Sequence, residues 1–272
     1  MLLFNVVSHF TAKKPEGKVP AAEIVKKREV CLFFARAAYH TGEGMAMLGQ
    51  LELDGGRGGR AERGSLYGLP VLRVRTDPEG WLGERRLRRA GKALRRGGVL
   101  RTLTPEDFSH WPLLARCGLL PVEPVPFLRA QSPALALELL DRQGVAPERA
   151  TVALRGQRAD REMARAAAEL CPKVGRLVIS ASRGGEELAH WLRWEFGIPV
   201  LPAGEWAQVE VCFRPEERRR AAQTLGLYGS APELAGLRIS APALAEEDRG
   251  NLPLLAALWE GGRLPKEGLK IT

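Results

Sequence analysis

The sequence predicts a Rossmann-like α/β protein, and three observations carry this prediction. Stretches rich in Val, Leu and Ile alternate with amphipathic stretches, which is the pattern of parallel strands joined by helices. The order strand, helix, strand, helix, strand occurs twice at a nearly constant offset. Hydrophobic residues make up 45% of the 272 residues and charged residues 27%, as in ordinary globular proteins. We therefore expect two similar βαβαβ halves, mostly parallel, with a C-terminal strand and helix extension.

The first half is defined by β-rich runs that Gly residues separate from an amphipathic helix. Leu82, Leu87, Ala90 and Leu94 fall on one face of this helix, and Gly97 ends it. A connecting helix follows, which Ser132 is expected to cap. The predicted strands are 69–76, 99–104 and 119–122, and the predicted helices are 81–96, 109–117 and 132–143.

The second half repeats this order and continues into the extension. Its predicted strands are 150–155, 176–181 and 198–201, and its predicted helices are 160–171 and 184–196. Beyond it we expect a strand at 208–213, a helix at 215–225, a strand at 237–240 and a helix at 252–260. Such halves assemble either into one doubly wound sheet or into two lobes, and the sequence leaves both open.

The two halves also agree in short motifs. His110-Trp111 in the first half matches His190-Trp191 in the second. Gly118-Leu119-Leu120-Pro121-Val122 matches Gly197-Ile198-Pro199-Val200. These matches favour an old duplication.

The chain divides by composition into four parts: a leader at 1–44, a first half at 45–145, a second half at 146–214 and an extension at 215–272. The leader holds five of the nine lysines but two of the 32 arginines. Codons for Gly42-Glu43-Gly44 resemble a bacterial ribosome-binding sequence just before Met45 and Met47. Two interpretations remain open: translation begins at one of these methionines, or 1–44 is a genuine segment with an amphipathic helix at 21–39.

Composition limits the class of protein. The formal net charge is +9, but arginine dominates it, as expected of a GC-rich genome, so the charge indicates little about partners. No apolar run reaches the roughly 20 residues that a membrane-spanning helix needs, so we expect no membrane partner. The four widely spaced cysteines form no CxxC pair, which predicts a reduced, cytoplasmic protein. They are Cys31, Cys117, Cys171 and Cys212.

The loop after the first strand of the second half is the first candidate site. A dinucleotide-binding loop would carry glycine at 156, 158 and 161, but this chain has Gly156, Arg158 and Arg161. Arginine prevents the backbone from approaching a pyrophosphate, although its guanidinium group is able to clamp a phosphate. A phosphate site and a purely structural turn both remain open.

The next strand end is the second candidate. Ser182 and Arg183 occupy the place where NADP-type sites hold a 2′-phosphate, and Gly184 and Gly185 would expose backbone N–H groups to an anion. NADP or another phosphate-bearing small molecule is the ligand that this pattern suggests. The alternative is that Ser182 simply caps the following helix.

The remaining polar groups give weaker indications. The helix at 85–96 is rich in arginine and suits either phosphate contacts or a solvated outer face. His110 and His190 are candidate bases, but their shared setting suggests packing. The chain shows no metal-ligand spacing and no local nucleophile motif.

The order of an α/β half, a Rossmann-like half and a helical tail resembles that of shikimate-dehydrogenase-like enzymes. This resemblance implies a Lys–Asp pair and asparagines that bind a polyol acid. Asparagine occurs here at Asn5 and Asn251, and Lys92 belongs to the basic helix. The resemblance therefore concerns architecture and does not extend to activity.

Three hypotheses for function follow from the sequence. The first is a non-catalytic or degenerate Rossmann-like binding or scaffold protein. The second is an NAD(P)- or nucleotide-dependent enzyme whose ligand site uses Gly156, Arg158, Ser182 and Arg183. The third is a nucleic-acid-associated protein that uses the arginines of the basic helix.

Overall fold

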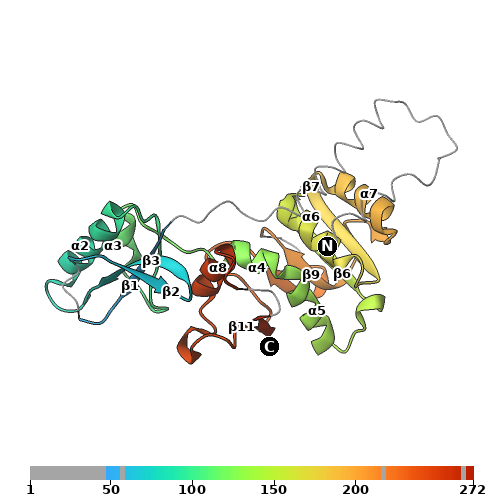
Figure 1. Cartoon of the computed structure of the whole chain (residues 1–272). Coiled ribbons are helices and arrows are strands. Elements are labelled where there is room, and N and C mark those ends of the chain that lie inside the picture. Colours follow the sequence, from blue (N-terminus) through green and yellow to red (C-terminus); the bar gives the residue numbers. More distant parts are fainter. Residues whose placement is uncertain (1–46, 56–58, 216–218, 265–267) are drawn as a thin grey trace, which may run out of the picture.

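The strands in the described part of the chain form two separate five-stranded sheets and one two-stranded sheet (Figure 1). The computed structural model describes residues 47–55, 59–215, 219–264 and 268–272. The predicted leader, 1–44, lies outside the described residues. Parallel sheets with helices between their strands make this a mixed α/β fold, and the strands do not join into a single doubly wound sheet.

The first sheet has the strand order β2-β3-β1-β4-β5, in which β2 is antiparallel to β3 and the other pairs are parallel. Its strands are β1 (Leu48–Glu52), β2 (Glu62–Leu66), β3 (Leu69–Arg75), β4 (Arg101–Leu103) and β5 (Leu120–Pro121). Its helices are α2 (Gly83–Arg96) and α3 (Trp111–Ala115). β3, β4, β5, α2 and α3 confirm the predicted elements of the first half.

Two strands of this sheet were not predicted. β1 lies between β3 and β4, so these two predicted strands are not neighbours, whereas β4 and β5 pair directly. The glycine and glutamine of β1 interrupt its apolar pattern, so the sequence alone does not indicate this strand. β2 is an exposed edge strand and therefore has no apolar face to recognise.

The second sheet has the order β10-β9-β6-β7-β8, and all its pairs are parallel. Its strands are β6 (Thr151–Arg158), β7 (Arg176–Arg183), β8 (Val200–Leu201), β9 (Ala207–Cys212) and β10 (Ala221–Gly226). The helices α4 (Val125–Ala130), α5 (Ser132–Arg142), α6 (Arg161–Leu170) and α7 (Gly185–Phe196) accompany it, and a short 3-10 turn (Pro147–Arg149) precedes β6.

The start of α5 differs from the prediction. α4 was not predicted, and it runs almost directly into α5, so the chain is already helical before Ser132. Gln131 is the N-cap residue of α5, and no side chain caps the helix. The expected cap by Ser132 is therefore wrong.

The predicted helix at 215–225 is also wrong, because 221–226 form strand β10. The sequence from Glu216 to Ala222 is rich in good helix formers, which explains the prediction. Pairing with β9 buries Thr224, Leu225 and Gly226 and overrides that local preference.

Two apolar clusters form most of the core. The smaller one joins β1, β3, α2 and α3 through residues such as Leu51, Leu72, Leu87 and Leu114. The larger one covers the helical face of the second sheet. It also includes Leu48, Leu69, Val71 and Leu103 from the opposite face of the first sheet.

The C-terminal extension links the two sheets. After β10, which belongs to the second sheet, it contains β11 (Ile239–Ser240), a 3-10 turn (Glu246–Asp248), α8 (Leu252–Glu260) and β12 (Lys270–Ile271). Figure 1 shows α8 beside the first sheet and next to α4. Glu260 forms an ion pair with Arg101 of β4 at 2.7 Å, and Asp248 accepts a hydrogen bond from Tyr67 at 2.7 Å. The Trp259 ring packs against Phe127 of α4.

None of the helices in the described part of the chain has the length and apolar character needed to cross a membrane.

Candidate functional site

The second sheet contains a point where the chain reverses its direction across the strands. From β6 the chain proceeds to β7 and β8, and it then returns to β9 on the other side of β6. In open parallel sheets, ligands bind at the carboxyl ends of the two strands that flank such a point. Here these ends lie after Arg158 of β6 and at Phe213 after β9.

An internal carboxylate occupies the helix N-terminus at this point. Asp160 is the N-cap of α6, and its Oδ1 accepts a hydrogen bond from the Met163 backbone N–H at 2.9 Å. A helix N-terminus attracts anions because its first N–H groups have no partner within the helix. The Asp160 side chain already satisfies one of these groups, at the place where a Rossmann-like protein would bind a pyrophosphate.

A guanidinium group occupies the other side of the same point. Arg129 of α4 donates to the Phe213 carbonyl at 2.8 Å and to the Leu227 carbonyl at 2.9 Å, so it caps the ends of β9 and β10. Its third contact is an ion pair with Glu162 in the first turn of α6 at 2.9 Å, and it lies over the Phe213 ring. Arg129 thereby ties three elements together across the reversal point.

The position of Gly156 is explained by packing. It lies within strand β6, not in a loop after it. A Cβ atom at this position would come within 2.7 Å of the Met163 methyl group. The glycine therefore lets α6 pack close to the strand, which is the structural alternative for this residue.

Arg158 and Arg183 lie side by side at the ends of β6 and β7. They are partners in the parallel register, so both side chains leave the same face of neighbouring strands about 4.8 Å apart. Both are exposed, and neither guanidinium group has a hydrogen bond or ion pair with another described residue. The Ala159 N–H donates to the Arg183 carbonyl and holds the two strand ends together. The structure thus brings these two predicted residues together.

The start of α7 differs from the expected cap. Ser182 lies exposed in β7 and does not cap the helix, so that interpretation is wrong. The N-cap is Gly184, whose φ of 73° belongs to the left-handed region that favours glycine. The helix has no side-chain cap, and Glu186 and Glu187 lie in its first turn.

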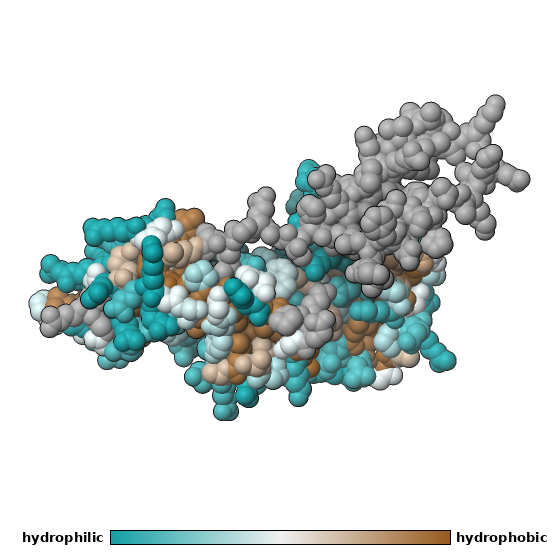
Figure 2. Space-filling view, viewed as in Figure 1, coloured by the Kyte–Doolittle hydropathy of each residue, from teal (hydrophilic) through white to brown (hydrophobic). Residues whose placement is uncertain are grey.

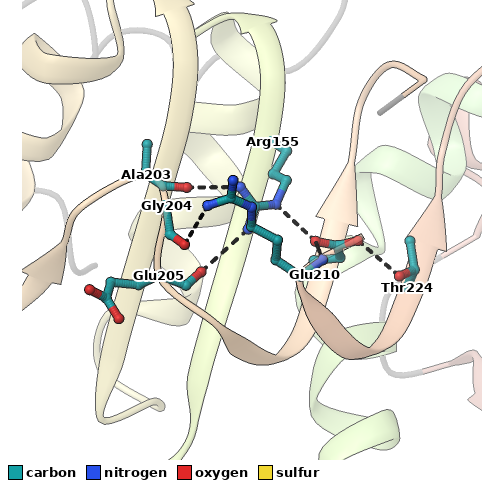
Figure 3. Close-up of polar contacts among 7 residues, drawn as sticks. Arg155, Ala203, Gly204, Glu205, Glu210 and Thr224 are labelled. Carbon is teal, nitrogen blue, oxygen red and sulfur yellow. Dashed lines mark hydrogen bonds and ion pairs between the residues drawn. The ribbon is translucent and has the colours of Figure 1, made fainter. Parts of the chain in front are cut away.

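A buried charged network on the opposite face of the second sheet was not predicted as a unit (Figure 3). Arg155 is 4% exposed and Glu210 is 0% exposed, and their side chains meet at 2.8 Å. Glu210 also accepts from the Thr224 hydroxyl at 2.9 Å and from the Arg220 backbone N–H at 3.3 Å. The sequence signal was available, because each charged residue interrupts an apolar predicted strand.

The same network holds the loop between β8 and β9. Arg155 donates to the Ala203 carbonyl at 3.0 Å and to the Glu205 carbonyl at 3.5 Å, while Arg220 donates to the Gly204 carbonyl at 2.7 Å. Every charge in the network is paired with another charge or with a carbonyl, as buried charges require. The arrangement therefore serves to hold the loop against the sheet.

The other candidate groups are not brought together. His110 is the N-cap residue of α3 beside the first sheet, whereas His190 is exposed on α7 beside the second. Burial raises the pKa of the Cys171 thiol to about 12, so it stays protonated and unreactive at neutral pH. The described residues contain no group of three or more His, Cys, Asp or Glu placed to hold a metal ion.

Comparisons with known proteins assign no family to this chain. No protein-family model matches this chain, and no curated protein matches it. Among solved structures, the L-tryptophan dehydrogenase from Nostoc punctiforme is similar, with 14% sequence identity and a TM-score of 0.28. The match covers 62% of this chain and 56% of that protein. A likeness at this level carries no conclusion about fold or activity.

Proposed function

We propose that this chain is a non-catalytic, degenerate Rossmann-like protein that acts as a binding or scaffold component. The observation that carries the proposal is the occupied reversal point of the second sheet. Asp160 caps α6 from within the chain, and Arg129 with Glu162 bridges the ends of β9, β10 and α6. These groups bind one another, whereas a nucleotide-binding Rossmann-like protein would keep its backbone N–H groups and charged side chains at this point available for the cofactor.

A ligand screen on the full chain tests this proposal. Differential scanning fluorimetry measures the Tm of the protein with one ligand at a time, added at about 100 times the micromolar Kd expected of a specific ligand. The ligands are NADPH, NAD, ATP, S-adenosylmethionine and a sugar nucleotide. A specific ligand at that ratio stabilises the native state by about 2.7 kcal/mol and would raise Tm by about 5 °C or more. We expect no such shift. A shift of this size with any of these ligands would overturn the proposal, whether or not it persists when Arg158 and Arg183 are both changed to Gln.

A second candidate function rests on the Arg158 and Arg183 pair. Two exposed guanidinium groups without a described partner lie next to Gly184 and Gly185 at the start of α7, which suits the phosphate of NADP or of another small molecule. In this case one phosphate-bearing ligand raises Tm, and Arg158→Gln with Arg183→Gln abolishes the shift. Arg63→Gln with Arg193→Gln removes the same charge elsewhere and should leave the shift intact.

We further propose that 45–145 and 146–214 are two related units that the extension at 215–272 joins. The matched His-Trp and Gly-x-Pro-Val motifs support the relation, and the Arg101–Glu260 ion pair and the Tyr67–Asp248 hydrogen bond support the joining role. α5 falls within the first range but packs on β9 of the second sheet, so contact between the units is extensive. Hydrogen exchange on the full chain tests the division. Two separate levels of protection are expected, and a single level for both sheets would contradict it.

A further inference from the structure

The outer side of α2 carries a row of cations that the proposed function does not use. We call this row the α2 stripe, and it consists of Arg85, Arg89, Lys92 and Arg96. All four side chains are exposed, and none has a hydrogen bond or ion pair with another residue in the described part of the chain. Figure 2 shows hydrophilic residues over much of the end of the molecule where Figure 1 places α2.

The spacing of the α2 stripe places its charges in a line. At 3.6 residues per turn, positions 85, 89, 92 and 96 fall within about 60° of arc around the helix axis. At 1.5 Å per residue the row is about 16 Å long, with steps of about 5–6 Å. Four cations at this spacing repel one another, so the free protein holds an arrangement that an extended polyanion would stabilise.

The other basic residues of α2 are already satisfied. Arg86 pairs with Asp77 at 2.8 Å, Arg88 pairs with Glu84 at 3.3 Å, and Arg95 donates to the Val99 carbonyl at 3.4 Å. Acidic partners thus neutralise Arg86 and Arg88, a carbonyl group binds Arg95, and the α2 stripe is left without a described partner. This contrast distinguishes the row from a surface of evenly mixed charge.

An exposed tryptophan stands at the beginning of the same helix. Trp81 is 92% exposed, more than Trp194 at 68%, although aromatic side chains of this size normally bury most of their surface. A tight turn holds it there: the Gly83 N–H donates to the Gly80 carbonyl, and a Cβ atom at Gly83 would overlap the Pro78 carbonyl. The turn therefore leaves the indole exposed four residues before Arg85, the first residue of the α2 stripe.

We propose that the α2 stripe and Trp81 bind a single strand of nucleic acid, with phosphates along the row and an unpaired base on the indole. Proteins that bind single strands combine cations that follow the backbone with aromatic rings on which bases stack. A membrane surface fits less well, because an interfacial helix inserts its apolar face. Leu87, Ala90 and Leu94 form that face here, and all three are completely buried.

The test measures binding of the full chain to labelled 20-nucleotide single-stranded RNA and DNA by fluorescence anisotropy, from 50 to 200 mM salt. Four phosphate contacts on a single strand contribute about 2.8 to the slope of log K against log salt. Changing all four residues of the α2 stripe to Gln should therefore flatten the slope by about 2.8 and weaken binding at least tenfold at 50 mM.

A matched variant controls for total charge. Arg63, Arg193, Arg238 and Lys270 are exposed residues outside α2, and changing all four to Gln removes the same four charges. Binding of this variant to a random polyanion such as heparin measures the general effect of losing four charges. Once that effect is subtracted, its salt slope and its affinity for the single strands should stay within about twofold of the wild type. An equal loss in both variants would overturn the assignment to α2.

Trp81 provides the second readout. Trp81→Ala should weaken single-strand binding about fivefold or more, as expected when base stacking worth about 1–3 kcal/mol is lost, while Trp194→Ala should leave it unchanged. Both variants should bind duplex DNA alike, because its bases are not free to stack. Wild-type binding that favours anionic phosphatidylserine vesicles over both single strands, or no binding to either strand at 50 mM salt, would refute the proposal.

Discussion

The two five-stranded sheets reach similar arrangements by different routes. Each has its first strand in the middle, β1 in one and β6 in the other, with parallel strands on both sides. In the first sheet the chain places β3 on one side before it adds β4 and β5 on the other. In the second it adds β7 and β8 first and returns for β9 and β10. The two sheets thus share a central first strand with parallel neighbours, but the chain adds the outer strands in a different order in each sheet.

The two sheets differ most in how deeply their charged side chains are buried. In the first sheet, β1, β3 and β4 bury apolar side chains, and the charged pair between strands, Arg73 and Glu52, stays partly exposed. In the second, Arg155 and Glu210 lie inside the layer, and their contacts hold a loop against a face that carries small residues such as Ala153 and Val178. The comparison teaches that the first sheet depends on apolar packing for its order, while the second adds a polar network.

Removing one member of the buried pair should have the largest effect. Glu210→Ala leaves the Arg155 guanidinium buried without its carboxylate, and loss of one partner of such a pair costs about 3–5 kcal/mol. Urea denaturation monitored by circular dichroism measures the change in the free energy of unfolding. Glu205→Ala, in the same loop but with an exposed side chain, should change it by less than about 0.5 kcal/mol.

The same pair can be replaced as a whole. Arg155→Met with Glu210→Leu removes both charges together and should recover most of the stability lost by Glu210→Ala, because no unpaired charge remains. If Glu210→Ala alone costs less than about 1 kcal/mol, the network does not distinguish the second sheet from the first.

A smaller effect is expected at the start of α6. Asp160→Ala removes the N-cap hydrogen bond to Met163 and should cost about 1 kcal/mol, whereas Asp160→Ser should retain most of it. The N-cap residue of α2 in the first sheet is Leu82, which makes no side-chain cap, so Leu82→Ala provides the comparison for a helix start that has no such bond. Equal losses for Asp160→Ala and Asp160→Ser would show that the cap contributes nothing. Urea denaturation serves here as well.

The weakest expected effect concerns the link between the first sheet and the extension. Tyr67 donates to Asp248 and accepts from the Ala245 N–H, on the surface, so Tyr67→Phe should cost less than about 1 kcal/mol at pH 7. The hydrogen bond to Asp248 raises the pKa of Tyr67 above 10.0. Because the folded-state pKa is raised, its contribution is complete below pH 10 and is lost as pH rises through the folded-state pKa.

A pH series of the wild type and Tyr67→Phe measures this directly. The stability difference between them should be constant from pH 7 to 9 and shrink above pH 10. A difference that grows with pH above 10 would contradict the hydrogen bond that links Tyr67 to Asp248.

Periodicity predicted the elements that have a clear apolar face. β3, β6, β7, β9, α2, α5, α6, α7 and α8 lie within a few residues of their predicted ranges. β1 and β2 lack such a face, and β10 has the composition of a helix. Their pairing depends on the rest of the sheet, which local sequence does not contain.

The candidate site was predictable only in part. The sequence indicated Arg158 and Arg183 because they follow the predicted strands 150–155 and 176–181, and parallel strands end at one edge. It did not indicate Arg129, whose partners are the carbonyl groups of Phe213 and Leu227, 84 and 98 residues away. Backbone carbonyls are present at every residue and leave no trace in the sequence, so such a contact becomes visible only in the fold.

The position of α8 near the C-terminus has a consequence for synthesis on the ribosome. Leu48, Leu69, Val71 and Leu103 share their core with α8, which begins at Leu252. At about 5–20 residues per second, the 149 residues that follow Leu103, up to and including Leu252, take about 7–30 s to translate. For that time the nascent chain displays an apolar surface that its own sequence is not yet able to cover. We expect chaperones to associate with the nascent chain during this interval and to leave when α8 emerges.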